Sequence, residues 1–177
     1  DRATVYARKS AERCEAELAK PRYRVAVRLG AGGSSDAPLR FTAPSFVVPC
    51  FSFCGATAVR DLDRDGRREV QLTLGTGAAT SYNAFFRLAG LRLVPIGTAR
   101  SPARPVVFVR GGHADFWNGV VCRAPNLVLS YFWERAGAHL KTRMTVYAYN
   151  GSVLRLRSIT HGTVPAGKLW RPSGRAC

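Results

Sequence analysis

The sequence predicts a single, mostly β domain with a helix at its N-terminus, and three observations lead to this prediction. The 177 residues, 46% of them hydrophobic, suffice for one ordinary core and do not require a second domain. After residue 21, apolar residues recur mainly with a period of two, the spacing of half-buried strands. Turn residues separate these short runs, so we expect all-β structure in blade-like antiparallel hairpins, as a partial propeller or a sandwich.

The N-terminal segment 1–21 has the spacing of a helix. One helical stripe is formed by Ala7, Ala11, Cys14 and Leu18. Pro21 ends this pattern, since proline cannot continue a helix. The next segment, 22–29, alternates apolar residues with arginines and predicts a strand with one buried and one solvated face. A Gly/Ser loop follows it.

From there on, short apolar runs between turn residues predict nine strands. They are expected at 56–60, 69–74, 82–88, 91–95, 105–110, 119–122, 127–132, 142–149 and 153–159. One hairpin pattern occurs twice, with an aromatic strand, a glycine turn at Gly90 or Gly151, and a returning strand that alternates Leu with Arg. Asn150-Gly151 is a strong hairpin signal because both residue types tolerate positive φ. We therefore expect residues 1–177 to form one domain with two divergent units, 56–95 and 105–162.

The five cysteines favour disulfides over a metal site. Cys50 and Cys54 form a lone C-x3-C, and Cys14, Cys122 and Cys177 stand far apart, which fits no zinc pattern. In an oxidising compartment we expect two disulfides and one free thiol. Several pairings remain open, and we favour Cys122 with Cys177, which would tie down the tail, and Cys50 with Cys54. The alternative is a cytosolic protein with buried thiols.

Charge and hydropathy restrict the location and the partners. The chain starts at Asp1 without a basic-then-apolar leader, which with the cysteines favours a mature secreted product over a trimmed chain. No apolar run approaches the roughly 20 residues of a membrane span. The formal net charge is +16, and 23 of the 27 basic residues are arginines spread along the chain. Such a field attracts polyanions nonspecifically at low salt.

The stretch DLDRDGRRE, residues 61–69, holds four of the chain's eleven acidic residues. Calcium prefers six to eight oxygen ligands at about 2.3 to 2.6 Å, and alternate residues of a tight loop can direct carboxylates to one centre. The expected ligands are the side chains of Asp61, Asp63, Asp65 and Glu69 and the main-chain carbonyl of Arg67. Gly66 would supply the positive φ of the turn. The alternative is a metal-free surface turn, in which neighbouring arginines neutralise the carboxylates.

The sequence around this loop is not that of an EF-hand. An EF-hand requires a bidentate Glu at loop position 12, where this chain has Leu72, and both flanks are strand-like. Strand, D-x-D-x-D-G-x-x-[DE], strand is instead the signature of FG-GAP and VCBS-type repeats, the calcium-bearing blades of integrin α-chain propellers and of many secreted bacterial proteins. AVRDLDRDGRREVQLTL resembles one such unit, and FFRLAGLRLV is similar to the remainder of a blade.

The resemblance covers residues 56–95 and implies one structural calcium held by the five loop residues named above. The chain departs from the family at Arg64, where many members have glycine, and it is too short for a complete propeller. The resemblance implies a secreted, calcium-stabilised β-repeat domain with a binding, structural or adhesive role. Its partner would be a protein or polysaccharide surface, and Ca²⁺ its only cofactor.

Two other functions remain open. His113 and Asp115, with His139 and His161, are the material for general acid–base chemistry, but none lies in a recognisable nucleophile motif. An extracellular hydrolase using His113 and Asp115 is therefore one alternative. A polyanion-binding protein driven by the net positive charge is the other.

Overall fold

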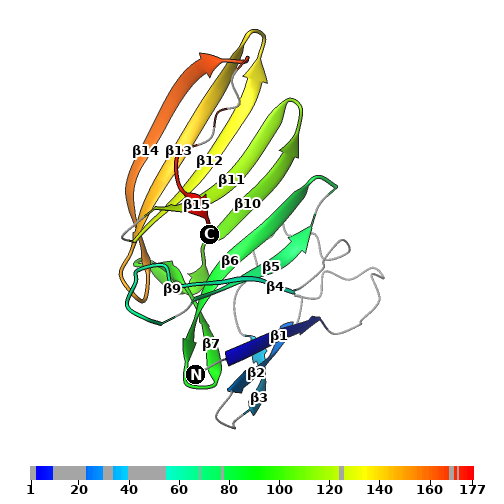
Figure 1. Cartoon of the computed structure of the whole chain (residues 1–177), viewed down its shortest axis with the longest axis vertical. Coiled ribbons are helices and arrows are strands. Elements are labelled where there is room, and N and C mark those ends of the chain that lie inside the picture. Colours follow the sequence, from blue (N-terminus) through cyan, green and yellow to red (C-terminus); the bar gives the residue numbers. More distant parts are fainter. Residues whose placement is uncertain are drawn as a thin grey trace.

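The computed structural model describes the backbone of residues 3–9, 23–29, 34–39 and 55–177, except residues 68, 77, 124, 125, 168, 169 and 171 (Figure 1). Every regular element in these ranges is a β-strand. The all-β prediction is therefore confirmed for the described part of the chain. The strands form one three-stranded and one twelve-stranded sheet.

The small sheet is built from the N-terminal segment. It contains the antiparallel strands β1 (Ala3–Lys9), β2 (Tyr23–Leu29) and β3 (Ser34–Leu39). The strand expected at 22–29 is present as β2. The helix expected at 1–21 lies mostly outside the described residues, and β1 occupies the part of it that is described.

The large sheet follows the predicted strands closely, with most boundaries moved by only a few residues. Its longer members are β4 (Gly55–Arg60), β5 (Glu69–Thr76), β6 (Thr80–Ala89), β10 (Val107–His113), β11 (Phe116–Arg123), β12 (Leu127–Ala136), β13 (His139–Tyr149) and β14 (Leu154–Pro165). Its short members are β7 (Arg92–Pro95), β8 (Gly97–Thr98), β9 (Ser101–Pro105) and β15 (Arg175–Ala176). The spatial order is β4-β5-β6-β10-β11-β12-β13-β14-β8-β9.

The twelve strands of the large sheet are joined edge to edge in one curled sheet and do not form separate blades, which differs from the expected propeller-like arrangement. The physical reason is that β6 changes partner along its length. Its first half pairs with β10 up to Ala84, and its second half pairs with β7 from Phe86 onward. Between them the Phe85 carbonyl accepts a hydrogen bond from the Ile96 N–H at 3.0 Å. The β6–β7 hairpin therefore branches off while β10 continues the sheet.

The large sheet is strongly curled into a half-barrel (Figure 1). The rings of Phe108 on β10 and Tyr147 on β13 lie 5.9 Å apart, centroid to centroid. Three strand spacings separate these strands, about 14 Å in a flat sheet. Curling brings them together, and we call the enclosed side the inner face. Its buried core consists of Leu62, Phe85, Ile96, Phe108, Val120, Cys122, Val128, Tyr149, Leu154 and Cys177.

A second core cluster covers the other side of β5 and β6. Its buried members are Val70, Leu72, Leu74, Ala84 and Phe86. Period-two alternation places the intervening polar residues of β5 on the inner face. There Asn83 Oδ1 accepts hydrogen bonds from Gln71 Nε2 at 3.1 Å and Thr73 Oγ1 at 3.0 Å. The outer face of β5 is thus apolar, and its inner face carries polar side chains that are hydrogen-bonded to Asn83 of β6.

The C-terminal tail is fixed to the sheet by a disulfide between Cys122 and Cys177, as predicted. β15 pairs with β11 beside it, Cys122 facing Arg175 across the ladder. The guanidinium of Arg123 adds a hydrogen bond to the Ser173 carbonyl at 3.1 Å. Cys14 and the expected Cys50–Cys54 pair lie outside the described residues.

Thiol counting tests the remaining cysteine predictions. Because we expect a second disulfide beside Cys122–Cys177, the denatured, unreduced protein should react with a thiol reagent at one of its five cysteines. A non-reducing peptide map should show the Cys122–Cys177 cross-link. Three reactive thiols would refute the Cys50–Cys54 pair and leave the described disulfide intact.

Both predicted glycine turns are present. Gly90 and Gly151 have φ of 58° and 83°, the left-handed region that glycine adopts without steric cost. The second turn is longer than a two-residue Asn-Gly hairpin, since β13 ends at Tyr149 and β14 starts at Leu154. The Asn150 side chain closes it by accepting a hydrogen bond from the Val153 N–H at 3.0 Å.

Candidate metal centre

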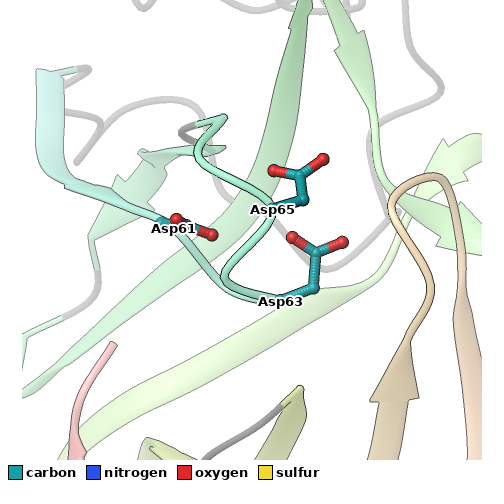
Figure 2. A group of neighbouring side chains, drawn as sticks. All are labelled: Asp61, Asp63 and Asp65. Atoms are coloured by element: carbon teal, nitrogen blue, oxygen red, sulfur yellow. The ribbon is translucent and has the colours of Figure 1, made fainter.

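The acidic loop connects β4 to β5, at the hairpin corner where the sequence places it. Leu62 is 4% exposed and belongs to the inner core, so it anchors the loop. Asp61 and Asp63 flank Leu62, and Asp65 follows two residues later. The three carboxylates lie close together (Figure 2). One oxygen from each carboxylate lies within 4.8 Å of the others. Three of the five predicted ligands are therefore brought together.

The backbone of the loop is curled by two left-handed residues. Gly66 has φ of 86°, as predicted, and Arg64 has φ of 63°. Glycine reaches the left-handed region more easily than arginine, which accounts for its frequency at the Arg64 position in the repeat family. The curl is held by hydrogen bonds from the Gly66 N–H to Asp61 Oδ2 at 3.1 Å and from the Arg67 N–H to Asp65 Oδ1 at 2.7 Å.

Asp63 carries the clearest signal for a cation. Burial raises the pKa of its carboxyl, and the neighbouring charges of Asp65 and Asp61 raise it further. Its Oδ1 atom is buried and accepts no hydrogen bond within the described part of the chain. A buried carboxylate oxygen without a donor is costly, and a bound cation would supply the missing interaction. The hard oxygen donors of this cluster fit calcium.

Glu69 lies beside the three-carboxylate cluster and is held by protein donors. Its Oε2 accepts a hydrogen bond from the Leu62 N–H at 2.7 Å, and its Oε1 accepts one from the Tyr149 hydroxyl at 3.2 Å. Burial raises the pKa of Glu69 to about 7, and the charges of Asp63 and Asp65 act in the same direction. The hydrogen bonds from Leu62 and Tyr149 oppose that rise. In this arrangement Glu69 ties the loop to the rest of the fold.

The turn between β13 and β14 forms the other wall of the site. A methyl group added at Gly151 would lie 3.4 Å from Asp63 Oδ2. Tyr149, from the same hairpin, reaches Glu69. Five strand spacings separate β5 from β13, about 24 Å in a flat sheet, so only the curl allows this contact. No local spacing in the sequence marks Tyr149 or Gly151 as neighbours of the acidic loop.

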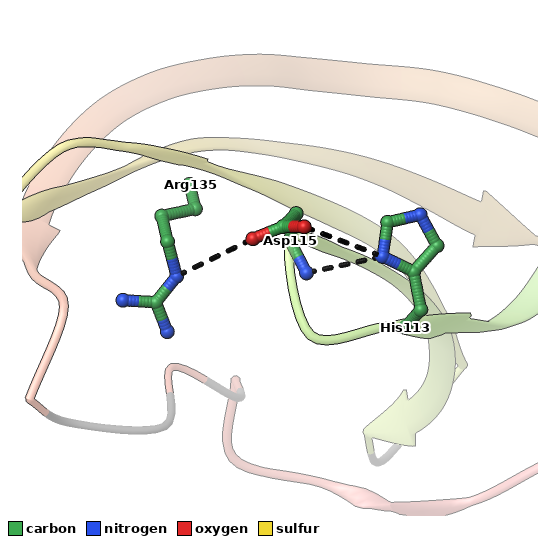
Figure 3. A network of polar contacts seen from close by, with 3 residues as sticks. All are labelled: His113, Asp115 and Arg135. Atoms are coloured by element: carbon green, nitrogen blue, oxygen red, sulfur yellow. Dashed lines mark hydrogen bonds and ion pairs between the residues drawn. The ribbon is translucent and has the colours of Figure 1, made fainter.

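His113 and Asp115 meet at an exposed turn between β10 and β11 (Figure 3). The Asp115 N–H donates to His113 Nδ1 at 3.2 Å, and the Asp115 carboxylate lies 3.8 Å from Arg135 Nε. The side chain of His113 is 54% exposed, and that of Asp115 is 70% exposed. Both side chains are therefore largely exposed to solvent in the described part of the chain.

No family model matches the chain, and no curated protein or solved structure matches it. The likeness to FG-GAP and VCBS-type repeats therefore rests on the loop motif and its flanks. Within the described ranges, no helix has the length and apolar character that a transmembrane span requires.

Proposed function

We propose that this chain is a calcium-stabilised, extracellular β domain with a binding or structural role, and that residues 56–95 are a calcium-bearing unit of the FG-GAP or VCBS type. Two observations carry the proposal: the carboxylates of Asp61, Asp63 and Asp65 lie close together, and the Oδ1 atom of Asp63 is buried without a hydrogen-bond partner. The Cys122–Cys177 disulfide supports an oxidising, extracellular compartment.

In the proposed site, Asp61, Asp63 and Asp65 hold the ion through their side chains, and Arg67 contributes its main-chain carbonyl. Glu69 keeps the loop in place through its hydrogen bond to the Leu62 N–H. Calcium accepts six to eight oxygens, so water completes the coordination. Bound calcium would offset the mutual repulsion of the carboxylates and supply a partner for Asp63.

The role of the ion is structural, because the acidic loop touches the β13–β14 turn as well as its own hairpin. Holding the loop in one conformation stabilises the closure of the curled sheet at this end. Extracellular calcium modules bind with dissociation constants of about 10⁻⁴ to 10⁻³ M. We expect an affinity in that range, which matches a domain that remains loaded outside the cell.

Thermal melting tests the calcium site. At about a hundredfold excess over the dissociation constant, calcium should stabilise the native state by about 2.7 kcal/mol. For a chain of this size, that corresponds to a rise of about 5 to 10 °C in Tm. Magnesium should have less effect, since it demands a smaller octahedral site. Asp63→Asn and Asp65→Asn should each abolish the calcium-dependent rise.

Asp115→Asn is the matched control, because it removes one exposed carboxylate that lies outside the loop. Its Tm should still rise with calcium as that of the wild type does. If the wild type melts at the same temperature in chelator and in calcium at about a hundredfold excess over the expected dissociation constant, and calorimetry gives no binding heat, the metal-free turn neutralised by arginines is the correct account.

A further inference from the structure

The inner face continues beyond the buried core into rows of exposed side chains on β11–β14. Residues paired directly across antiparallel strands share a face, so the registers of these strands define the rows. One row runs Asn118, Phe132, Arg143, His161; the next runs Val120, Ser130, Thr145, Ile159; and the third runs Cys122, Val128, Tyr147, Leu156. We call the solvent-accessible part of these rows the open rows.

The open rows contain the large hydrophobic side chains with the greatest exposure in the described part of the chain. Leu156 is 56% exposed and Ile159 is 52% exposed. Both lie on β14, next to Tyr147 and Thr145 of β13 respectively. Singly exposed apolar residues need no explanation, and these two support a contact surface only together with the polar groups of the same rows.

A cavity of about 180 Å³ lies in these rows. Among its lining residues are Asn118, Ser130, Phe132, Arg143, Thr145 and Tyr147. Within the described residues, the side chains of Asn118, Ser130 and Thr145 make no hydrogen bond to the protein. The Arg143 guanidinium has no carboxylate partner there and lies over the Phe132 ring, 5.9 Å from its centroid. The cavity therefore combines free hydrogen-bonding groups, an aromatic edge and an unneutralised cation.

The charge of the open rows favours an anion, because Arg143 is the one formally charged side chain among the residues of the three rows. Asp115 lies at the exposed turn beside His113 and Arg135. Glu134 is paired across the ladder with Lys141, one row beyond the cavity. No carboxylate thus lies in the rows that hold Arg143.

We propose that the open rows bind a carboxylated sugar unit of an acidic polysaccharide. The carboxylate pairs with the Arg143 guanidinium, whose planar fork accommodates two parallel hydrogen bonds to it. Asn118, Ser130 and Thr145 exchange hydrogen bonds with the ring hydroxyls. The apolar side of the sugar packs on Tyr147 and the β14 aliphatic side chains. This inference gives a ligand to the binding role proposed above and rests on that role.

The size and composition of the cavity favour a sugar over other anions. Pockets for drug-sized ligands measure roughly 300 to 1,000 Å³, so about 180 Å³ accommodates a small unit whose neighbours extend along the surface. An acyl chain would require an enclosed apolar tunnel, whereas this cavity is open to solvent and its lining includes the polar side chains of Asn118, Ser130 and Arg143.

Binding of oligogalacturonate to the wild type, measured by calorimetry at physiological ionic strength, tests the inference. Arg143→Gln should weaken binding at least tenfold, and the double variant Asn118→Ala, Thr145→Val should also weaken it. The control is Arg155→Gln, which removes the same charge from an exposed arginine paired with Ala148 on the opposite face of β14. Its affinity should stay within twofold of the wild type. Methyl-esterified oligogalacturonate, which lacks the carboxylates, should bind at least tenfold more weakly.

Equal losses in Arg143→Gln and Arg155→Gln would overturn the inference, because they would show nonspecific attraction by net charge. Tighter binding of oligothymidylate than of oligogalacturonate would overturn it in favour of nucleic acid. The titrations are run on folded protein both in calcium-free buffer and in calcium, with protein and sugar solutions brought to the same free calcium concentration because the galacturonate carboxylates bind calcium themselves. Absence of binding in both refutes the ligand, whereas an unchanged Tm on adding calcium refutes the metal, so the two failures are separate results.

Discussion

Replacing Cys122 and Cys177 together by alanine should lower the free energy of unfolding by about 4 kcal/mol. The disulfide closes a loop with a sequence separation of 55 residues. A cross-link that closes a loop of this length lowers the conformational entropy of the unfolded chain. This stabilises the folded state by about 4 kcal/mol. Both sulfurs also lie in the inner core, where Cys122 is 5% and Cys177 is 2% exposed. Urea denaturation of the double variant and the wild type measures the difference.

The matched control is Ser173→Ala, which weakens an exposed contact between the tail and Arg123 without touching the cross-link. It should cost less than about 0.5 kcal/mol, as exposed polar substitutions do. Reduced wild type should unfold near the double-alanine variant. A double variant within about 1 kcal/mol of the oxidised wild type would show that the tail contributes little to native stability.

In calcium-stripped buffer, the protein should lose stability as the pH rises from about 4.5 to about 7. Glu69 has its pKa raised from 4.5 to about 7 in the folded state, first by burial and then by the charges of Asp63 and Asp65. Between these values the native state binds more protons than the unfolded chain, so unfolding becomes easier as protons are removed. The full shift corresponds to about 3 kcal/mol, measured by urea denaturation across the pH range.

Glu69→Gln isolates this effect, because the amide keeps the shape of the protonated side chain and does not titrate. In this variant, most of the fall in stability between pH 4.5 and 7 should disappear. A smaller dependence of stability on pH should remain because the pKa of Asp63 is raised too. Tyr149→Phe removes a hydrogen bond that lowers the pKa of Glu69. The stability of this variant should therefore continue to fall to a higher pH than that of the wild type. A wild type whose stability is flat or rises between pH 4.5 and 7 would contradict the buried state of Glu69.

Local patterns in the sequence predicted local features of the fold. Alternation of apolar and polar residues located the strands, and Gly66, Gly90 and Gly151 adopt the left-handed φ expected of glycine in turns. The D-x-D-x-D-G spacing placed the three aspartates in one loop, which the structure brings together. Each of these features depends on residues within a few positions of one another, where spacing alone determines geometry.

The arrangement of the sheet could not be predicted in the same way. Period-two alternation shows which residues share a face, but not which strands lie side by side. The partner change of β6 at Phe85 depends on contacts with Ile96 and β10. The position of Glu69 likewise depends on Tyr149, 80 residues further along the chain. The candidate site was therefore predicted as a loop, and its second wall was not.

The hydrogen bond between Glu69 and Tyr149 also affects the order of folding. It closes a segment of 80 residues, so we expect it to form after the intervening strands β6 and β10–β13 have paired. At a synthesis rate of about 5 to 20 residues per second, Tyr149 follows Glu69 from the ribosome by several seconds at least. During that interval the acidic hairpin lacks its second wall. The metal loop should therefore acquire its final shape late, when the C-terminal hairpin docks.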